Sequence, residues 1–399
     1  MTTDFGDKRL EDFRAELRQW LNEHRRPALA SKGEYELERE AWRNPGSPLY
    51  EDFLAWEKAS LEARLVCPHW PVEYGGRGLD DLEMAVLAEE FARADMPRVT
   101  RGMGERLAGP AILAHGTPEQ KAYFLPRVVS GEDRYCQGFS EPDAGSDLAA
   151  VATQGVVEGD EIVITGQKIW TSRAHLADTL FLLCRTDPHA PKHKGISYVL
   201  VPMRDNGITV RPLITMSGED AFSQEYIDGA RAPLFNVIGG LNNGWRSAMT
   251  TLGSERGAVA AVQHLEYEKE WEALVERARE LGRDSDPLIR QKLAWAYCQV
   301  HVMKATGQRV LATLASGEEL GAEASLTKLV WSEYHRRLGE IAIDIEGAEA
   351  LVRPSGDGYR VGRWQKTFLT SRAETIFAGT SEVQRRIVAE RVLGLPRSS

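Results

Sequence analysis

The sequence predicts an α+β protein with an N-terminal helical domain (residues 1–130), a middle β-sandwich or barrel domain (residues 131–242) and a C-terminal helical bundle (residues 243–399). Apolar residues recur at helical spacing in the first and last parts, whereas the middle part consists of short apolar runs separated by turn residues. With 399 residues, the chain is long enough to hold two or three domains with large cores.

The N-terminal part begins with an amphipathic pattern over residues 8–24, with five apolar residues on one helical face: Leu10, Phe13, Leu17, Trp20 and Leu21. Further helices are expected near 48–65, 81–95 and 118–129. Thr117 stands directly before the last of them, where its hydroxyl would cap the helix, and Pro118 suits the first helical position.

The segment Pro71–Leu79 is too rich in glycine and proline for a regular element. Two interpretations remain open. It is either a tight turn between helices, which the sequence slightly favours, or a loop that helps to shape a substrate cleft.

The middle part contains six expected strands, at residues 152–158, 161–168, 178–186, 195–203, 207–214 and 222–228. In the second of these, Ile162 and Ile164 alternate with Val163 and Thr165, which is the period of a half-buried strand. The spacing of the turn residues is typical of a sandwich or small barrel.

Helical periodicity returns near Trp245 and continues to the end of the chain. Asp286 is placed to cap, and Pro287 to begin, a long helix that reaches about residue 316. Another helix is expected from about 323 to 350, and the last begins at Ser381.

Composition and charge exclude several classes of protein. No apolar stretch approaches the roughly 18 residues that span a bilayer, and the first residues lack the basic and apolar regions of a secretory signal. A net charge of −10 argues against binding to nucleic acid. Four widely spaced cysteines, without metal-ligand spacing, are expected to be buried and reduced in a cytoplasmic protein: Cys67, Cys136, Cys184 and Cys298.

The stretch from Tyr135 to Ser172 carries the densest chemical signal. Small hydrogen-bonding residues surround the Pro142–Asp143 turn, where backbone N–H groups are open to a ligand. Later, Trp170 offers a flat aromatic face and is followed by two hydroxyls. A flat heteroaromatic cofactor would fit these residues, although a β-hairpin with a buried tryptophan is the better explanation of Trp170-Thr171-Ser172 when that tripeptide is taken alone.

Four motifs in the same order resemble the acyl-CoA dehydrogenase family. They are P-V-E-Y-G-G-R-G-L at 71–79; E-P-D-A-G-S-D with G-Q-K-I-W-T-S, ending at Ser172; E-R at Glu255-Arg256; and A-G-T-S-E-V-Q-R-R at 378–386. The resemblance implies the family's three-domain fold and its FAD-dependent α,β-dehydrogenation of acyl-CoA thioesters to 2-enoyl-CoA. The chain has no G-x-G-x-x-G after a strand, so a bound flavin would not lie on a Rossmann crevice.

The resemblance also implies the residues that contact FAD. They are Gln137, Phe139, Ser140, Gly145, Ser146, Trp170, Thr171 and Ser172 in the middle domain, and Arg277, Arg279, Gly347, Thr380 and Glu382 in the C-terminal domain. Trp170 would lie near the flavin ring and Ser172 near its N5 edge. The substrate would contact Ser146, Arg256, Ala378 and Gly379. No metal site is expected.

The catalytic base is the first departure from the common pattern. The best-known members carry a glutamate where this chain has Ala378, and a methyl group cannot accept a proton. A second branch of the family carries the base at the glutamate of the E-R pair, which implies Glu255 here. Without the resemblance, Glu255 would be read as a surface ion-pair residue.

The second departure concerns subunit contacts. Family members reach a neighbouring subunit's FAD through segments that correspond to Arg277–Gly282 and Asp344–Ala348. Here the carboxylates Asp344 and Glu346 would stand unfavourably near a pyrophosphate. The chain is therefore expected either as a homo-oligomer (dimer or tetramer) with a rearranged loop, or as one half of a heterotetramer with a related chain.

The expected partners are acyl-CoA and an electron-transfer flavoprotein. Two alternatives remain open. One is a flavin oxidase or monooxygenase on the same fold, and the other is a non-catalytic partner subunit of a heteromeric dehydrogenase.

Overall fold

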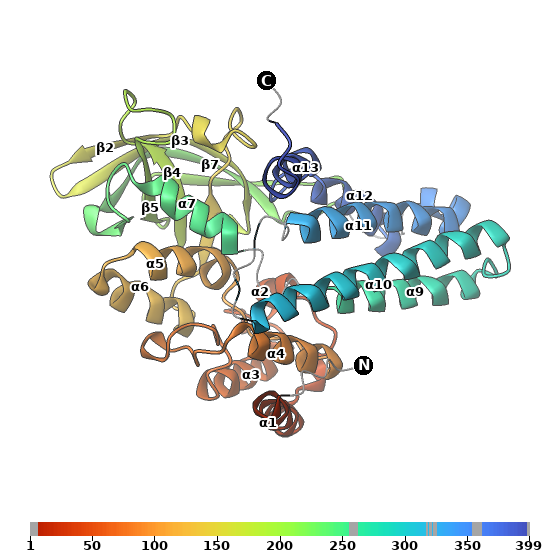
Figure 1. Ribbon diagram of the computed structural model, residues 1–399. Coiled ribbons are helices and arrows are strands. Elements are labelled where there is room, and N and C mark those ends of the chain that lie inside the picture. The colour runs from red at the N-terminus through yellow and green to blue at the C-terminus, as the bar shows by residue number, and fades with distance from the viewer. Residues whose placement is uncertain are drawn as a thin grey trace. The chain divides into compact units, whose positions relative to one another are not determined.

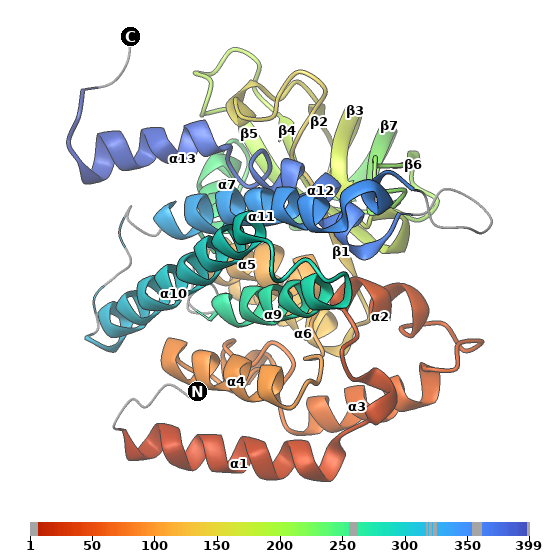
Figure 2. The ribbon, with the colours of Figure 1, turned by 90° about the vertical axis from the view of Figure 1, so that its right-hand side faces the viewer.

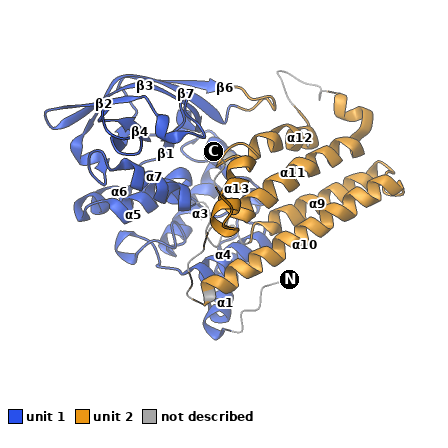
Figure 3. Cartoon of the chain, turned by 45° about the horizontal axis from the view of Figure 1, so that its top comes forward, with its two compact units in different colours: residues 1–213, 220–255 blue, residues 214–219, 256–399 orange. Residues whose placement is uncertain are grey.

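The structure is a computed structural model that describes residues 7–254, 262–316, 318, 321, 325–352 and 361–396. The chain divides into two compact units, residues 1–213 with 220–255, and residues 214–219 with 256–399 (Figure 3). The first unit thus contains both the expected N-terminal helical part and the expected β part. The domain boundaries at residues 130 and 242 stay a prediction.

The first unit begins with six α-helices: α1 Lys8–His24, α2 Glu34–Glu40, α3 Tyr50–Glu62, α4 Asp81–Arg93, α5 Gly109–His115 and α6 Pro118–Ser130. In α1 the predicted apolar face is confirmed, because Leu10, Phe13, Leu17 and Leu21 are buried. The predicted cap of α6 is also confirmed, since the Thr117 side chain accepts from the backbone of Gln120 and Pro118 opens the helix.

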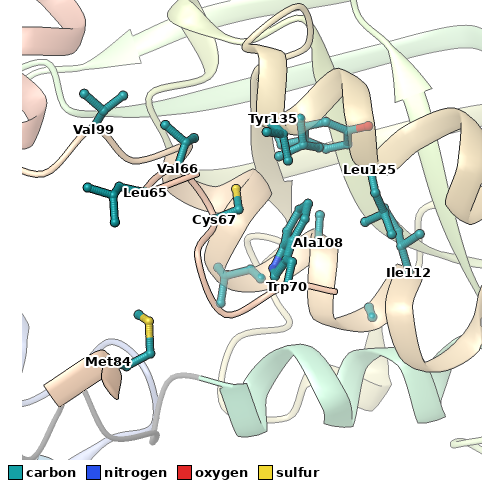
Figure 4. Close-up of a cluster of buried hydrophobic side chains, with 14 of the residues drawn as sticks. Leu65, Val66, Cys67, Trp70, Met84, Val99, Ala108, Ile112, Leu125 and Tyr135 are labelled. Atoms are coloured by element: carbon teal, nitrogen blue, oxygen red, sulfur yellow. The ribbon is translucent and has the colours of Figure 1, made fainter. Parts of the chain in front are cut away.

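The segment Pro71–Leu79 forms a tight turn around the short 3-10 helix Val72–Tyr74. Gly75 and Gly78 have φ of 95° and 72°, and a Cβ at Gly76 would stand 2.1 Å from the Trp70 carbonyl oxygen. Trp70 is fully buried, and Figure 4 shows Ala108, Ile112 and Leu125 near it.

Eight strands follow: β1 Tyr135–Gly138, β2 Gln154–Glu158, β3 Glu161–Ser172, β4 Thr179–Arg185, β5 Ile196–Pro202, β6 Ile208–Leu213, β7 Phe222–Pro233 and β8 Val237–Ile238. They form one mixed sheet in the order β6-β7-β3-β2-β4-β5-β8, with β1 parallel to β4. Ile162 and Ile164 are buried, as the alternation predicted. Helix α7 (Gly244–Gly253) packs on β5 so closely that a Cβ at Gly244 would lie 2.3 Å from the Tyr198 nitrogen (Figure 1).

The second unit is helical: α9 His264–Glu280, α10 Pro287–Ala315, α11 Ser325–Glu346, α12 Arg363–Glu374 and α13 Ser381–Ile387. The α10 helix contacts α9 and α11, and both α12 and α13 pack on α11 (Figure 2). Asp286 caps α10 through the amides of Leu288 and Ile289, as predicted. The unit has its own core, which includes Leu274, Leu338 and Trp364.

Three of the cysteines are buried as expected, but Cys298 is exposed, so its predicted burial is wrong. Cys298 lies on α10 among exposed neighbours, because a long helix presents one side away from its packing partners. Within the described ranges, no helix is both long and apolar enough to cross a membrane. The same residues contain no group of three or more metal-ligating side chains.

Candidate active site

The loop that follows β1 lies beside the end of β3. A turn closes between Glu141 and Ala144, whose backbone nitrogens each donate to the other residue's carbonyl oxygen at 2.9 and 3.1 Å. The backbone nitrogen of Ile169 donates to the Ser140 carbonyl oxygen at 3.0 Å. The two halves of the central motif, residues 141–147 and 166–172, are therefore neighbours in space.

A buried ion pair fixes this arrangement. The Nζ atom of Lys168, which is 0% exposed, lies 2.8 Å from Glu141 Oε1 and also donates to the Leu183 carbonyl oxygen at 2.7 Å. Glu141 further accepts from the backbone nitrogens of Ala152 and Thr153 at 2.7 and 3.0 Å. Burial alone would raise the pKa of Glu141, but Lys168 and these donors hold it below its ordinary value. Both residues lie within the quoted motifs, yet the sequence did not reveal that they pair.

Trp170 stands at a β-bulge. The pairing of β3 with β7 shifts register between Ile169 and Thr171, and Trp170 has a φ of 63°. Its side chain is 59% exposed, and its ring meets the edge of Phe222 with the centroids 6.1 Å apart. An exposed indole on a rigid strand provides a flat apolar face for a planar ring, which fits a bound flavin. The alternative of a buried tryptophan is wrong.

Thr171 points the other way. It is fully buried, and its hydroxyl donates to Oε2 of Glu225 on β7. The next residue, Ser172, is half-buried at the end of β3. Thr171 is thus turned away from the face that Trp170 presents, and it would act on a flavin only through its neighbours.

The remaining predicted cofactor residues of the first unit differ in their exposure. Gly145 and Ser146 are exposed on the loop, and a Cβ at Gly145 would meet no atom within 4 Å, so the loop leaves room for a ligand. Ser140 and Gln137 are half-buried. Phe139 is buried and packs edge-on against Phe181, which makes its side chain part of the core.

In the second unit, two of the predicted substrate residues form a left-handed turn before α13. Ala378 and Gly379 have φ of 51° and 85°, and Gln384 Nε2 donates to the Ala378 carbonyl oxygen at 3.1 Å. A Cβ at Gly379 would lie 2.6 Å from that nitrogen, so a side chain there would displace it. Thr380 caps α13, since the Val383 nitrogen donates to its hydroxyl at 3.2 Å.

A polar cavity of about 450 Å³ adjoins this turn. Its lining includes the predicted residues Thr380 and Glu382 together with Arg336 and Arg385. Glu333 neutralises part of the positive charge, because Arg385 lies 3.0 Å and Arg336 3.2 Å from its carboxylate oxygens. The cavity offers hydroxyl and guanidinium groups, which are suited to a phosphate-bearing ligand.

The residues predicted to reach a neighbouring flavin are engaged within the chain. Arg277 forms a two-pronged ion pair with Glu346 at 2.7 and 3.0 Å, and its pKa is raised above the ordinary value, first by that hydrogen bond. Arg279 lies 3.1 Å from Glu276 on the surface. Gly347, with φ of 60°, follows directly after α11. The predicted base Glu255 and its neighbour Arg256 lie outside the described residues.

Family models match nearly the whole chain. Those described as the N-terminal, middle and C-terminal domains of acyl-CoA dehydrogenase match residues 7–132, 136–229 and 242–393.

Individual proteins give the same result. The chain is 41% identical to acyl-CoA dehydrogenase IpdE1 of Mycobacterium tuberculosis, over 98% of this chain and 99% of that protein. The identity to IpdE1 of Mycolicibacterium smegmatis is 39%, over 97% and 98%. Among solved structures, the Tcur3481-Tcur3483 steroid ACAD is 34% identical with a TM-score of 0.80, over 98% of this chain and 99% of that one. The ChsE4-ChsE5 complex from Mycobacterium tuberculosis is 28% identical with a TM-score of 0.74, and the match covers all of both chains.

Proposed function

The chain belongs to the acyl-CoA dehydrogenase family, and we propose that it dehydrogenates a steroid-derived, ring-bearing acyl-CoA with Glu255 as the catalytic base. Its membership makes it an FAD-dependent oxidoreductase that acts on acyl-CoA. The finer substrate class is supported by its similarity to a structure titled as a steroid ACAD.

The observation that carries the assignment of the base is Ala378. Removing the weakly acidic α-proton of a thioester requires a base, and a methyl group at this position cannot supply one. Glu255 is the glutamate of the E-R pair, where one branch of the family carries its base. Since a carboxylate in an apolar cleft has a raised pKa, it would be a stronger base there than in water.

Each remaining group then has a proposed task. FAD, when bound, supplies the acceptor for the β-hydride. Trp170 and the loop with Gly145 and Ser146 would hold and orient the flavin, and Ser172 would donate a hydrogen bond to its edge. The backbone N–H of Ala378 would donate to the thioester oxygen, because changing a side chain leaves the amide in place. Thr380 and Glu382 would contact the cofactor from the second unit.

The test compares Glu255→Gln with the parent in a dye-coupled assay on acyl-CoAs that range from short branched chains to ring-bearing ones. We expect turnover to fall by a factor on the order of a hundred or more, while the FAD content and acyl-CoA binding stay unchanged. Glu272→Gln, an exposed change on α9, is the matched control and should turn over like the parent. If Glu255→Gln also turns over like the parent, the base lies elsewhere and a partner-subunit role becomes the leading interpretation.

The substrate class is read from the same screen. We expect the highest kcat/KM for a ring-bearing acyl-CoA, and a preference for straight chains would refute the steroid-derived class. We also propose an electron-transfer flavoprotein as the acceptor. Fast reaction of the reduced protein with O2 would instead favour an oxidase.

We infer further that the chain assembles with a related chain. The Arg277–Glu346 ion pair supports this, because it occupies the arginine that would otherwise reach a neighbour's pyrophosphate. One similar structure is the ChsE4-ChsE5 complex, and another carries the double name Tcur3481-Tcur3483. Co-purification of the two chains, with FAD at half the total chain count, is the expected result. A homo-oligomer with one FAD per chain would refute the inference.

A further inference from the structure

A buried carboxyl lies directly beneath the bulge that presents Trp170. Glu225 on β7 is 0% exposed. Its Oε2 atom accepts the hydrogen bond from the Thr171 hydroxyl, while its Oε1 atom has no hydrogen-bond partner among the residues that the structure describes. A buried carboxyl with an incomplete set of partners is costly for the fold, so its presence points to a task other than stability.

The position of Glu225 in the sheet links it to the bulge. It pairs with Lys168 in the β3–β7 register, and Ser223, two residues earlier on β7, pairs with Thr171. The register shift lies between these two pairs, at Ile169 and Thr171. The Thr171–Glu225 hydrogen bond therefore spans the irregular step, where the backbone ladder does not hold the strand in place.

Among the described residues, no nearby charged group supplies the missing hydrogen bond to Oε1 of Glu225. Lys168 is the neighbouring cation, but its ammonium group is held by Glu141 and by backbone carbonyl oxygens. The Cys136 thiol on β1 is fully buried; burial raises its pKa, and the nearby charge of Glu225 raises it further. Burial raises the pKa of Glu225 to about 7, so near neutral pH a large part of it is uncharged.

We propose that Glu225 is a positioning residue for flavin binding: by accepting the Thr171 hydroxyl, its carboxyl fixes the bulge that turns Trp170 outward and sets the direction of Ser172. The chemistry explains the residue type. Lys168 is buried, so regular alternation from it would turn Trp170 inward and Thr171 outward; a bulge of one residue reverses this, exposing Trp170 and burying Thr171. The Glu225 carboxyl stabilises the inward position of the Thr171 hydroxyl, because it accepts the hydrogen bond that this buried hydroxyl needs. The proposal rests on the proposed roles of Trp170 and Ser172.

The test measures FAD affinity by flavin fluorescence and the environment of the bound flavin by its visible circular dichroism. Glu225→Leu removes the acceptor and should weaken FAD binding about tenfold and change the dichroism of what remains bound. Glu225→Gln keeps an acceptor oxygen of the same shape and should restore both to within about twofold of the parent. Ile227→Val, a buried change on the same strand, controls for general loss of packing and should leave both signals unchanged.

A double-variant cycle tests the route through Thr171. Thr171→Val should reproduce the effect of Glu225→Leu, and the two changes together should be no worse than either alone. The proposal is overturned if Glu225→Leu binds FAD as tightly as the parent, or if Glu225→Gln binds it as weakly as Glu225→Leu. It is also overturned if Ile227→Val weakens FAD binding as much as Glu225→Leu, or if the effects of Glu225→Leu and Thr171→Val multiply in the double variant. A parent protein that cannot take up FAD, even with a related chain present, would instead refute the proposed function.

Discussion

His335 on α11 lies between two carboxylates of the second unit, and replacing it gives the sharpest prediction for stability. Its Nδ1 atom is 2.6 Å from Glu374 on α12, and its Nε2 atom is 2.9 Å from Glu270 on α9. Burial alone would lower the pKa of His335, but its close contacts with the carboxylates of Glu270 and Glu374 raise it from 6.5 to about 10. The charged imidazolium on α11 thus forms ion pairs with α9 and α12.

The shift fixes the sign and the size of the effect. A group with a raised folded-state pKa stabilises the fold fully below its unfolded pKa of 6.5 and loses that contribution as the pH rises to about 10. The difference between those two pKa values corresponds to at most about 5 kcal/mol. Since breaking a buried ion pair costs about 3–5 kcal/mol, we expect His335→Gln to destabilise the second unit by that amount at pH 6.

Amide hydrogen exchange of α11 peptides between pH 6 and 10, corrected for the intrinsic exchange rate, measures this free energy locally. In the parent, the opening free energy of α11 should fall as the pH rises, and in His335→Gln it should be lower at pH 6 and nearly independent of pH. His301→Gln on α10 is the control, because that imidazole is exposed and contacts the Tyr297 carbonyl oxygen. Equal pH slopes in the parent and His335→Gln would refute the reasoning.

Three further predictions concern the first unit. Lys168→Met should lower the unfolding free energy, measured by urea titration, by about 3–5 kcal/mol, because Glu141 is left buried without its cation. A loss below about 1 kcal/mol would contradict the importance of this ion pair. Trp170→Ala should weaken FAD retention about tenfold in a fluorescence titration. Because the indole is exposed, the change should not lower the melting temperature of the apoprotein. Unchanged retention would show that Trp170 does not contact the flavin. Gly244→Ala should lower the melting temperature by several degrees or prevent folding, because the new Cβ would stand 2.3 Å from a backbone nitrogen of β5. Gly253→Ala on the same helix meets no atom within 4 Å and should be neutral, so equal behaviour of the two glycine variants would be inconsistent with close packing of α7.

The sequence predicted those elements whose signals are local. Thr117 and Asp286 cap α6 and α10 as predicted, because a cap depends on residues within one turn. The helix Arg363–Glu374 was not predicted, because Trp364 is its only large buried residue and an apolar stripe is missing.

The motifs named candidate site residues, but they did not reveal the directions in which those side chains point. Alternation along β3 cannot reveal a bulge, and one extra residue reverses every side chain that follows it. The inward turn of Thr171 was therefore not visible. Partners such as Glu225 and Thr171, or Glu141 and Lys168, are 54 and 27 residues apart, so only the folded sheet brings them together. The carboxylate of Glu346, which looked unfavourable beside a pyrophosphate, is held by Arg277.

The outward turn of Trp170 also has an optical consequence. All ten tryptophans lie within the described residues, and Trp170 alone among them is exposed; the others are buried or half-buried. A collisional quencher such as acrylamide should reach this indole first, and its emission should lie at longer wavelength than that of the other nine. A ligand that covers the bulge would protect Trp170 from the quencher. The unlabelled protein thus contains its own optical reporter of whether this face is covered.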